Sequence, residues 1–285
     1  MRNNEQLKNG GFKKLVKIGA VADIHQEPLD FTREIRFFVD DMNNRFFPDF
    51  VVVLGDLVGG KAYGRGLRKI ASEFAKCYAP CYYVIGNHDL ETTTRPEFKK
   101  KVGIDYGWAS ITVDFLHVIF LDSSWGPRGP SGGPTGHIPQ EELEWLKEDL
   151  SKISSYQPIV VFSHFPIRVG ESRIDNEDTL MNIFKNYNLI ATFGGHYHPG
   201  AYQKGDSDGI HHFVLHRMGH WVPGNINGSY AKITISPNLI KIKGECLQMS
   251  AEVPVLCPEK RKPVSGPDHH YFTQNGKLSI VQSLK

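Results

Sequence analysis

Five short polar motifs carry the residues of this sequence whose types and spacing suit metal chemistry, and each motif closes an apolar run. They are Asp23-Ile24-His25, Gly55-Asp56, Gly86-Asn87-His88-Asp89, Ser163-His164 and Gly195-His196-Tyr197-His198. Any one of them alone would fit an ordinary turn, but reactive groups in α/β proteins gather at strand ends. We therefore predict one dinuclear metal site whose ligands are Asp23, His25, Asp56, Asn87, His164, His196 and His198.

These ligands mix oxygen and nitrogen atoms, a set that suits Mn²⁺, Fe²⁺/Fe³⁺ or Zn²⁺ and needs no thiolate. Seven ligands can give two ions about four ligands each only if one carboxylate bridges them. Two divalent ions bring about four positive charges, whereas Asp23, Asp56 and one bound hydroxide bring about three negative ones. The predicted site therefore keeps a net positive charge, which favours an anionic phosphate.

Two metal ions about 3.5–4 Å apart can hold the attacking and leaving oxygens of an in-line displacement and lower the pKa of a shared water. The protein must then supply an acid for the leaving oxygen, and His88 is well placed because it adjoins the ligand Asn87. Asp89 could orient His88 or cap a helix. The motifs predict hydrolysis of a phosphoric ester through a metal-bridging hydroxide, with His88 as the catalytic residue.

Hydrophobic periodicity indicates which elements position these motifs. Helical spacing at 32–46 and 66–78 separates three apolar runs, so the first part of the chain predicts a parallel sheet core. Residues 111–113 and 118–121 are expected as short neighbouring strands, and 140–150 as an amphipathic helix. A helix is also expected at 179–187, with the remaining strands at 15–22, 50–54, 81–85, 159–162, 189–193, 213–215, 230–235 and 239–242.

The five motifs, in this order, resemble those of the calcineurin-like metallophosphoesterase family over roughly residues 15–245. The resemblance implies an α/β fold that is a four-layer sandwich of two mixed β-sheets flanked by helices. We expect this domain to span residues 13–250. Residues 251–285 contain four prolines and are expected to form a C-terminal extension that packs on the body or is partly mobile.

The resemblance also implies how the ligands divide between the two ions. One metal would be held by Asp23, His25, Asp56 and His198. The other would be held by Asp56, Asn87, His164 and His196, with Asp56 as the bridge. His88 would match the family's non-ligand histidine, which assists the departing group.

Departures from the family motifs indicate which branches of the family this sequence resembles. Phosphoprotein phosphatases of the calcineurin type carry Asp-Arg-Gly shortly after Gly-Asp and Arg-Gly before Asn-His, but here Leu57 follows Asp56 and Ile85 precedes Gly86. Residues 121–150 are similar to class III cyclic-nucleotide phosphodiesterases. Residues 195–228 are similar to manganese-dependent ADP-ribose and CDP-alcohol diphosphatases. The resemblance implies a small nucleotide-like substrate, cleaved at a phosphodiester or pyrophosphate bond.

Three alternatives stay open on the same fold: a phosphomonoesterase, a nuclease, and a metal-binding interaction module without catalysis. The choice between one ester link and two depends on pocket shape, which a sequence does not show. The 33 basic and 31 acidic residues give a formal charge of +2, so no duplex nucleic acid is expected as a partner. A non-catalytic module would be indicated by loss of ligands or of His88, and all of them are present.

The composition is that of an ordinary soluble globular protein, with 40% hydrophobic and 22% charged residues among 285. No stretch approaches the roughly 18 consecutive apolar residues of a transmembrane helix, so no membrane partner is expected. Residues 1–11 are polar and lack the apolar core of a secretory signal, which predicts a cytoplasmic protein if Met1 is the natural start. The sequence gives no indication of the oligomeric state.

Residues beside the motifs could contribute to substrate binding. Trp125 and Arg128 lie in a long loop rich in glycine and proline, and such loops are often functional. They could form a rim around the substrate. Three residues that follow the Gly-Asp motif could bind phosphate or a base: Lys61, Tyr63 and Arg65.

Overall fold

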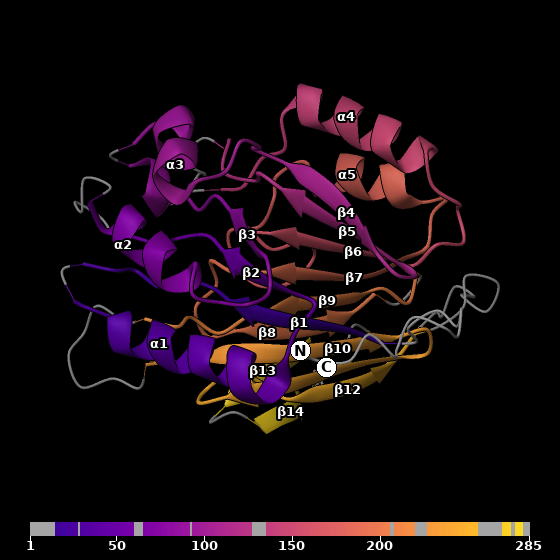
Figure 1. Cartoon of the computed structure of the whole chain (residues 1–285). Helices are drawn as coiled ribbons and strands as arrows, with labels where there is room; N and C mark the ends of the chain where they lie inside the picture. The colour runs from indigo at the N-terminus through magenta and orange to yellow at the C-terminus, as the bar shows by residue number, and fades with distance from the viewer. Residues whose placement is uncertain are drawn as a thin grey trace, which may run out of the picture.

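Two mixed β-sheets face one another, and helices cover the outer face of each sheet (Figure 1). This arrangement confirms the four-layer α/β sandwich that the family resemblance implies. The computed structural model describes residues 15–27, 29–59, 65–91, 93–126, 135–205, 208–219, 227–255, 270–274 and 277–281.

Sheet 1 has six strands in the order β12-β11-β10-β1-β2-β3. Strands β1, β2 and β3 run parallel, as the sequence predicts, and β10, β11 and β12 extend the sheet in antiparallel pairs. The bounds are β1 Val16–Val21, β2 Phe50–Leu54, β3 Cys81–Val84, β10 Tyr230–Ser236, β11 Leu239–Glu245 and β12 Ala251–Pro254.

Sheet 2 has eight strands in the order β14-β13-β8-β9-β7-β6-β5-β4. Strands β5, β6, β7 and β9 are parallel, and the strands at both edges are antiparallel to their neighbours. The bounds are β4 Ala109–Val113, β5 Leu116–Leu121, β6 Ile159–Ser163, β7 Leu189–Gly194, β8 Ala201–Lys204, β9 His211–Val214, β13 His270–Gln274 and β14 Lys277–Val281.

Alternation of apolar side chains along each strand builds the four layers. In β2, Phe50, Val52 and Leu54 face sheet 2, whereas Val51 and Val53 face the helices, because successive side chains point to opposite faces. The helices over sheet 1 are α1 Thr32–Asp41, α2 Arg65–Phe74 and α3 Arg95–Val102, and those over sheet 2 are α4 Gln140–Ser151 and α5 Glu177–Phe184. Within the described ranges, no helix is both long and apolar enough to cross a membrane.

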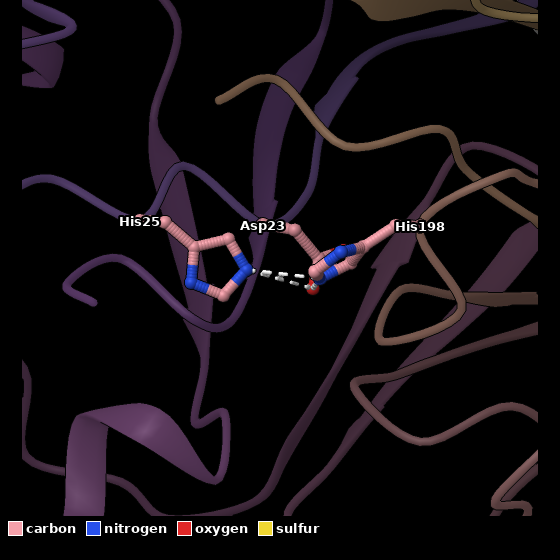
Figure 2. A group of neighbouring side chains, drawn as sticks. All are labelled: Asp23, His25 and His198. Carbon is pink, nitrogen blue, oxygen red and sulfur yellow. Dashed lines mark hydrogen bonds and ion pairs between the residues drawn. The ribbon is translucent and has the colours of Figure 1, made fainter. Parts of the chain in front are cut away.

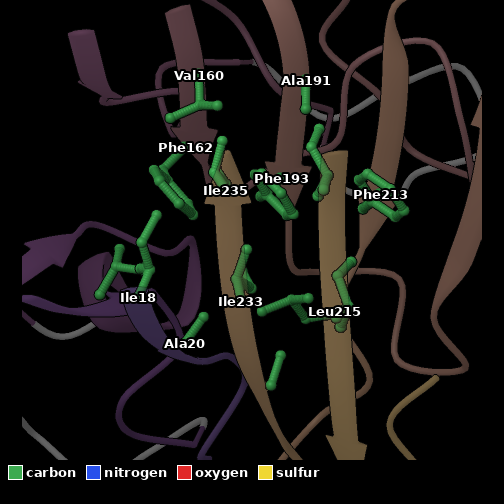
Figure 3. Packing of buried hydrophobic residues seen from close by; sticks show 14 of the residues in the cluster. Ile18, Ala20, Val160, Phe162, Ala191, Phe193, Phe213, Leu215, Ile233 and Ile235 are labelled. Carbon is green, nitrogen blue, oxygen red and sulfur yellow. The ribbon is translucent and has the colours of Figure 1, made fainter. Parts of the chain in front are cut away.

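A row of stacked aromatic rings crosses the inner face of sheet 2. Phe162 lies between Phe120 and Phe193, with ring centroids 5.8 Å and 5.1 Å away. Figure 3 shows Phe162, Phe193 and Phe213 in this row, with the rings of Phe193 and Phe213 5.1 Å apart. The ring of Tyr202 lies 4.8 Å from that of Phe213. Aromatic side chains bury large areas, and Phe50 of sheet 1 packs edge-on against Phe120 and Phe162, so this row contributes to the packing between the two sheets.

Some element bounds differ from those the sequence predicts. The helix expected at 32–46 is α-helical only to Asp41, after which Met42–Phe46 forms a π-helical turn. That turn ends because Phe47 is left-handed (φ 52°) and donates its N–H to the Met42 carbonyl. The helix expected at 66–78 ends at Phe74.

The sequence pattern predicts no element at 95–102, where the structure has α3, and none at β8. A capping box begins α3, since Thr94 accepts from Glu97 N–H and the Glu97 carboxylate accepts from Thr94 N–H. Strands β12 and β13 pair with β11 and β8 respectively. The division of the chain at residue 250 stays a prediction.

Replacement of a central ring in the aromatic row should destabilise the fold. We expect Phe193→Ala to lower the free energy of unfolding by about 3–5 kcal/mol, because a large cavity remains between the sheets. Phe193→Leu, which refills most of that space, should cost clearly less. Urea denaturation followed by circular dichroism measures both, and equal losses for Ala and Leu would contradict a packing role for the ring.

Candidate metal centre

All eight candidate residues follow strands whose carboxyl ends meet at one edge of the sandwich. Loops after β1, β2 and β3 carry the residues from sheet 1, and loops after β6 and β7 carry those from sheet 2. The structure therefore brings together every residue of the predicted site. Sheet 1 supplies Asp23, His25, Asp56, Asn87 and His88, and sheet 2 supplies His164, His196 and His198.

Backbone hydrogen bonds hold the loops of this centre in register. Asp23 N–H donates to the Gly55 carbonyl at 3.2 Å, and His25 N–H donates to the Asp56 carbonyl at 2.9 Å. The second sheet joins them through His164, whose Nδ1 lies 2.8 Å from the Leu54 carbonyl oxygen. The two halves of the centre are thus linked directly by a contact between the protein's own residues.

Sharp backbone turns aim the side chains inward. Asp23, His25, Asp56 and His196 all have positive φ, at 52°, 50°, 49° and 63°. For residues other than glycine this region is sterically costly, and it persists only where surrounding contacts enforce it. Four such residues in one site indicate that surrounding contacts hold the backbone in a strained conformation, which directs these side chains inward.

Gly86 is required because the loops after β2 and β3 approach each other closely. A Cβ atom at this position would lie 2.1 Å from Asp56 N and 2.2 Å from Asp56 Oδ1. Any side chain would therefore push the Asp56 carboxylate away. The glycine of the Gly-Asn-His-Asp motif is a packing requirement of the site.

The first group of ligand atoms comes from Asp23, His25 and His198 (Figure 2). The Nε2 atoms of the two histidines lie 3.0 Å apart. They lie 3.9 Å (His25) and 3.6 Å (His198) from Asp23 Oδ1. Three donor atoms of both sheets thus converge on one point, as the first predicted metal position requires.

The second group comes from Asp56, His164 and His196, with Asn87 between them. Asn87 Oδ1 lies 3.0 Å from His164 Nε2 and 3.1 Å from His196 Nδ1. Asp56 Oδ2 lies 3.4 Å from His164 Nε2 and also 4.0 Å from His25 Nε2 of the first group. Asp56 therefore stands between the two groups, where a bridging carboxylate is expected.

The environments of His25 and His196 favour metal binding at neutral pH, whereas His164 has a raised pKa and must lose a proton before it can bind a metal. Because His164 Nδ1–H donates to the Leu54 carbonyl, its Nε2 is left to face the site. Burial lowers the pKa values of His25 and His196 to about 4, so both are neutral, the form that binds metals. Burial also opposes charge on His164, but Asp56 outweighs it and raises its pKa to about 9.

The buried carboxylates provide the test of whether metals fit this centre. Asp23 and Asp56 are completely buried, yet the histidines around them outweigh burial and hold their pKa values below the usual range. Asp56 Oδ2 is buried and has no hydrogen-bond partner. His164 Nε2 lies 3.4 Å from this oxygen, but a buried carboxylate oxygen that lacks a hydrogen bond is unfavourable. The described residues therefore fit two divalent cations, which would satisfy this oxygen.

His88 faces the centre from its edge. Its N–H donates to Asp56 Oδ1 at 2.9 Å, and its Nε2 lies 4.0 Å from Asp56 Oδ2. Its Nδ1 lies 2.9 Å from Glu91 Oε1, and the side chain is 29% exposed. These distances fit a proton donor at the mouth of the site, and they also place His88 in a possible ligand group with His25 and Asp56.

Asp89 joins two of the ligand loops. Its buried carboxylate accepts N–H groups from Leu57 and Val58 at 2.8 Å and 3.2 Å, and from Gly86 at 3.0 Å. It thus ties the loop of Asp56 to the loop that follows β3. This role differs from the two that the sequence left open, orientation of His88 or a helix cap.

Arg217 is a residue of the centre that the sequence motifs did not reveal. Its N–H donates to the His198 carbonyl at 3.3 Å, and the next two N–H groups donate to the carbonyls of Ala22 and Asp23. The side chain is half-buried, and its buried Nε has no hydrogen-bond partner. Its position in a polar stretch directly after an apolar strand was the one available sequence signal.

The other residues considered for substrate binding are only partly described. Lys61, Tyr63 and Arg128 lie outside the described residues, as does the side chain of Arg65. Trp125 is described and is 43% exposed.

Comparison with protein families gives a direct assignment. The family model for calcineurin-like phosphoesterases matches residues 16–200, which contain all eight residues of the centre. The chain belongs to this family. The family resemblance read from the five motifs is therefore confirmed.

Curated relatives of this metallophosphoesterase are hydrolases. It is 25% identical over 246 residues to the manganese-dependent ADP-ribose/CDP-alcohol diphosphatase of Arabidopsis thaliana, covering 68% of this chain and 78% of that protein. It is 25% identical over 145 residues to the 3',5'-cyclic adenosine monophosphate phosphodiesterase CpdA of Escherichia coli K12, covering 51% of this chain and 50% of that one. The prediction of an enzyme of the phosphoric ester hydrolase class is thereby confirmed.

A solved structure supports the same fold. A dimetal phosphatase from Danio rerio superposes with a TM-score of 0.68 and covers 85% of this chain and 99% of that one. Sequence identity is only 16%, so this likeness concerns the fold.

Substitutions should separate the bridging carboxylate from the proton donor. We expect Asp56→Asn to lose both metals, because its carboxylate lies between the two groups. His88→Ala should keep both metals and lose about 10²–10⁴-fold in turnover. Metal content after loading with Mn²⁺ and desalting measures the difference. Asp105→Asn, at an exposed position, is the control, and equal metal content in the Asp56 and His88 variants would refute this division of roles.

Proposed function

We propose that this protein is a dinuclear-metal-dependent phosphohydrolase that cleaves a phosphodiester or pyrophosphate bond of a small nucleotide-like substrate. The observation that carries the proposal is that two ligand groups lie side by side with Asp56 between them, its Oδ2 3.4 Å from His164 Nε2 and 4.0 Å from His25 Nε2. In the proposal, one cation is held by Asp23, His25, Asp56 and His198, and the other by Asp56, Asn87, His164 and His196. The cations are Mn²⁺, Fe²⁺/Fe³⁺ or Zn²⁺, which suit these ligands.

When bound, the two cations would polarise the phosphoryl group and activate water as the nucleophile. The remaining work falls to side chains of the protein. His88 Nδ1 is engaged by Glu91, so Nε2 is the atom that faces the centre and can give a proton to the leaving oxygen. Its partial exposure lets the proton be replaced from solvent after each turnover.

Arg217 supplies a cation for the phosphate that none of the five motifs contains. Its backbone is fixed against the loops of Asp23 and His198, and its guanidinium forms no ion pair with any described residue. A guanidinium can bind two phosphate oxygens at once. We therefore assign Arg217 to the non-bridging oxygens of the scissile phosphate.

The choice of a diester or pyrophosphate bond is supported by the relatives, whose names describe a diphosphatase and a cyclic-nucleotide phosphodiesterase. A phosphomonoesterase uses the same metal chemistry and differs only in what the remainder of the pocket accepts. A nuclease would need a cationic track, and the near-neutral net charge of +2 argues against one.

Cleavage of model esters tests the proposed function. With Mn²⁺, we expect hydrolysis of bis(p-nitrophenyl) phosphate to exceed that of p-nitrophenyl phosphate, and chelation should abolish both activities. The release of p-nitrophenol measures the rates. Preference for the monoester would favour a phosphomonoesterase. No cleavage of these esters, of ADP-ribose or of CDP-alcohols by protein that holds two metals would favour an interaction module.

Substitution of Arg217 tests its contact with phosphate. Arg217→Gln should lower kcat/KM for the diester roughly 10–100-fold, because a hydrogen bond to a charged group is worth about 1.5–3 kcal/mol. Arg217→Lys should recover part of the loss. Metal content should be unchanged in both. Arg33→Gln, on the exposed face of α1, is the matched control, and a kcat/KM like that of the unmodified protein in Arg217→Gln would remove Arg217 from the site.

A further inference from the structure

A pocket of about 310 Å³ lies at the N-terminal end of α3, and we call it the Trp125 pocket. Its volume falls at the lower end of the range of roughly 300–1,000 Å³ for small-molecule sites. None of the proposed metal ligands lines it. Its wall is made by Arg95, Pro96, Lys99, Gly107, Trp108, Asp122 and Trp125.

The loop that carries the exposed tryptophan is fixed to two loops of the metal centre. Ser124 Oγ donates to the Ile85 carbonyl at 2.9 Å, and Ile85 leads directly into the Gly-Asn-His-Asp motif. Ser123 Oγ accepts the N–H of Phe165 at 2.9 Å, next to the ligand His164. The loop of Trp125 is therefore hydrogen-bonded to the loops after β3 and β6, both of which carry candidate ligands of the centre.

Trp125 is held in place by a stacked cation. The guanidinium carbon of Arg95 lies 3.5 Å from the centre of the indole ring. Arg95 is itself fixed, since its Nε lies 2.6 Å from Asp122 Oδ2 and its Nη2 donates to the Ser124 carbonyl at 2.9 Å. The indole keeps 43% of its surface exposed. It is an aromatic surface that Arg95 supports from one side.

The wall of this pocket combines two aromatic rings with one cation that has no carboxylate partner among the described residues. The guanidinium of Arg95 is compensated by the fully buried carboxylate of Asp122. Lys99 Nζ donates to the Asp105 carbonyl at 3.0 Å and keeps its charge. The rings of Trp108 and Trp125 give the wall a large flat apolar surface, which suits an aromatic group.

We propose that Trp125 stacks against the nucleobase of the substrate while the scissile phosphate lies at the metal centre. This inference rests on the proposed function and deepens it, because it names the part of the substrate that gives specificity. Every base has a π-face, so stacking on tryptophan selects nucleotides over base-free phosphates without selecting one base. The pocket thereby distinguishes a nucleotide phosphohydrolase from one that acts on any phosphoric diester.

Equilibrium binding to the manganese-loaded full chain tests this assignment. The probes are AMP, which has a base, and ribose 5-phosphate, which lacks one. Trp125→Ala should weaken AMP binding by about tenfold or more, as base–aromatic stacking predicts, and leave ribose 5-phosphate binding within about twofold. Trp125→Phe should retain most of the AMP affinity. Tyr78→Ala, which removes an 84% exposed aromatic side chain elsewhere, is the matched control.

The two probes keep this inference separate from the proposed function. Equal weakening of both probes, or unchanged AMP binding, would overturn the role of Trp125 even if the protein cleaves diesters. Failure of the unmodified protein to prefer AMP over ribose 5-phosphate would overturn nucleobase recognition in the same way. Selective loss of AMP binding in Trp125→Ala would support the stacking role, and absence of diester cleavage in that same protein would count only against the proposed reaction. Quenching of tryptophan emission by AMP, lost in Trp125→Phe, provides a second readout.

Discussion

The buried charge of Asp23 and Asp56 is the constraint on which the rest of this structure depends. Both carboxylates are buried at the edge of the sandwich, and Asp56 keeps an oxygen without a hydrogen-bond partner. Nearby positive charge stabilises such carboxylates, and both the surrounding histidines and bound divalent cations could provide it. The left-handed turns and the glycine contact at Gly86 are further costs of bringing these groups together.

The sandwich makes that assembly possible because each sheet contributes a share of the ligands. Aromatic packing between the sheets sets their spacing, and the His164–Leu54 hydrogen bond aligns their edges. Asp89 then links two loops of sheet 1 by accepting three N–H groups. The positions of the candidate ligands therefore depend on packing, because their loops are also held by residues outside the predicted ligand set.

Much of this arrangement could be predicted from local sequence patterns. The features that the sequence did not predict depend on contacts between residues that are distant in the chain. Apolar runs predict β1, β2, β3, β6 and β7, and the motifs at their ends predict every candidate ligand that the structure brings together. Arg217 was missed because its place depends on backbone hydrogen bonds outside its own strand, from its own N–H to His198 and from the Gly219 N–H to Asp23 far away in the chain. Strand β13 pairs with β8 across a long separation, which no local periodicity reports. The roles of the ligands, as opposed to their proximity, stay predictions until metals are measured.

The pairing of β1 with β10 has a consequence for synthesis of the chain. About 200 residues separate these neighbours in sheet 1, so at a translation speed of about 5–20 residues per second β1 waits roughly 10–40 s for its partner. All metal ligands emerge earlier, yet the strand that carries Asp23 still has one open edge. The nascent polypeptide therefore leaves the ribosome with one edge of the hydrophobic strand β1 unpaired. During this interval a chaperone could cover that edge.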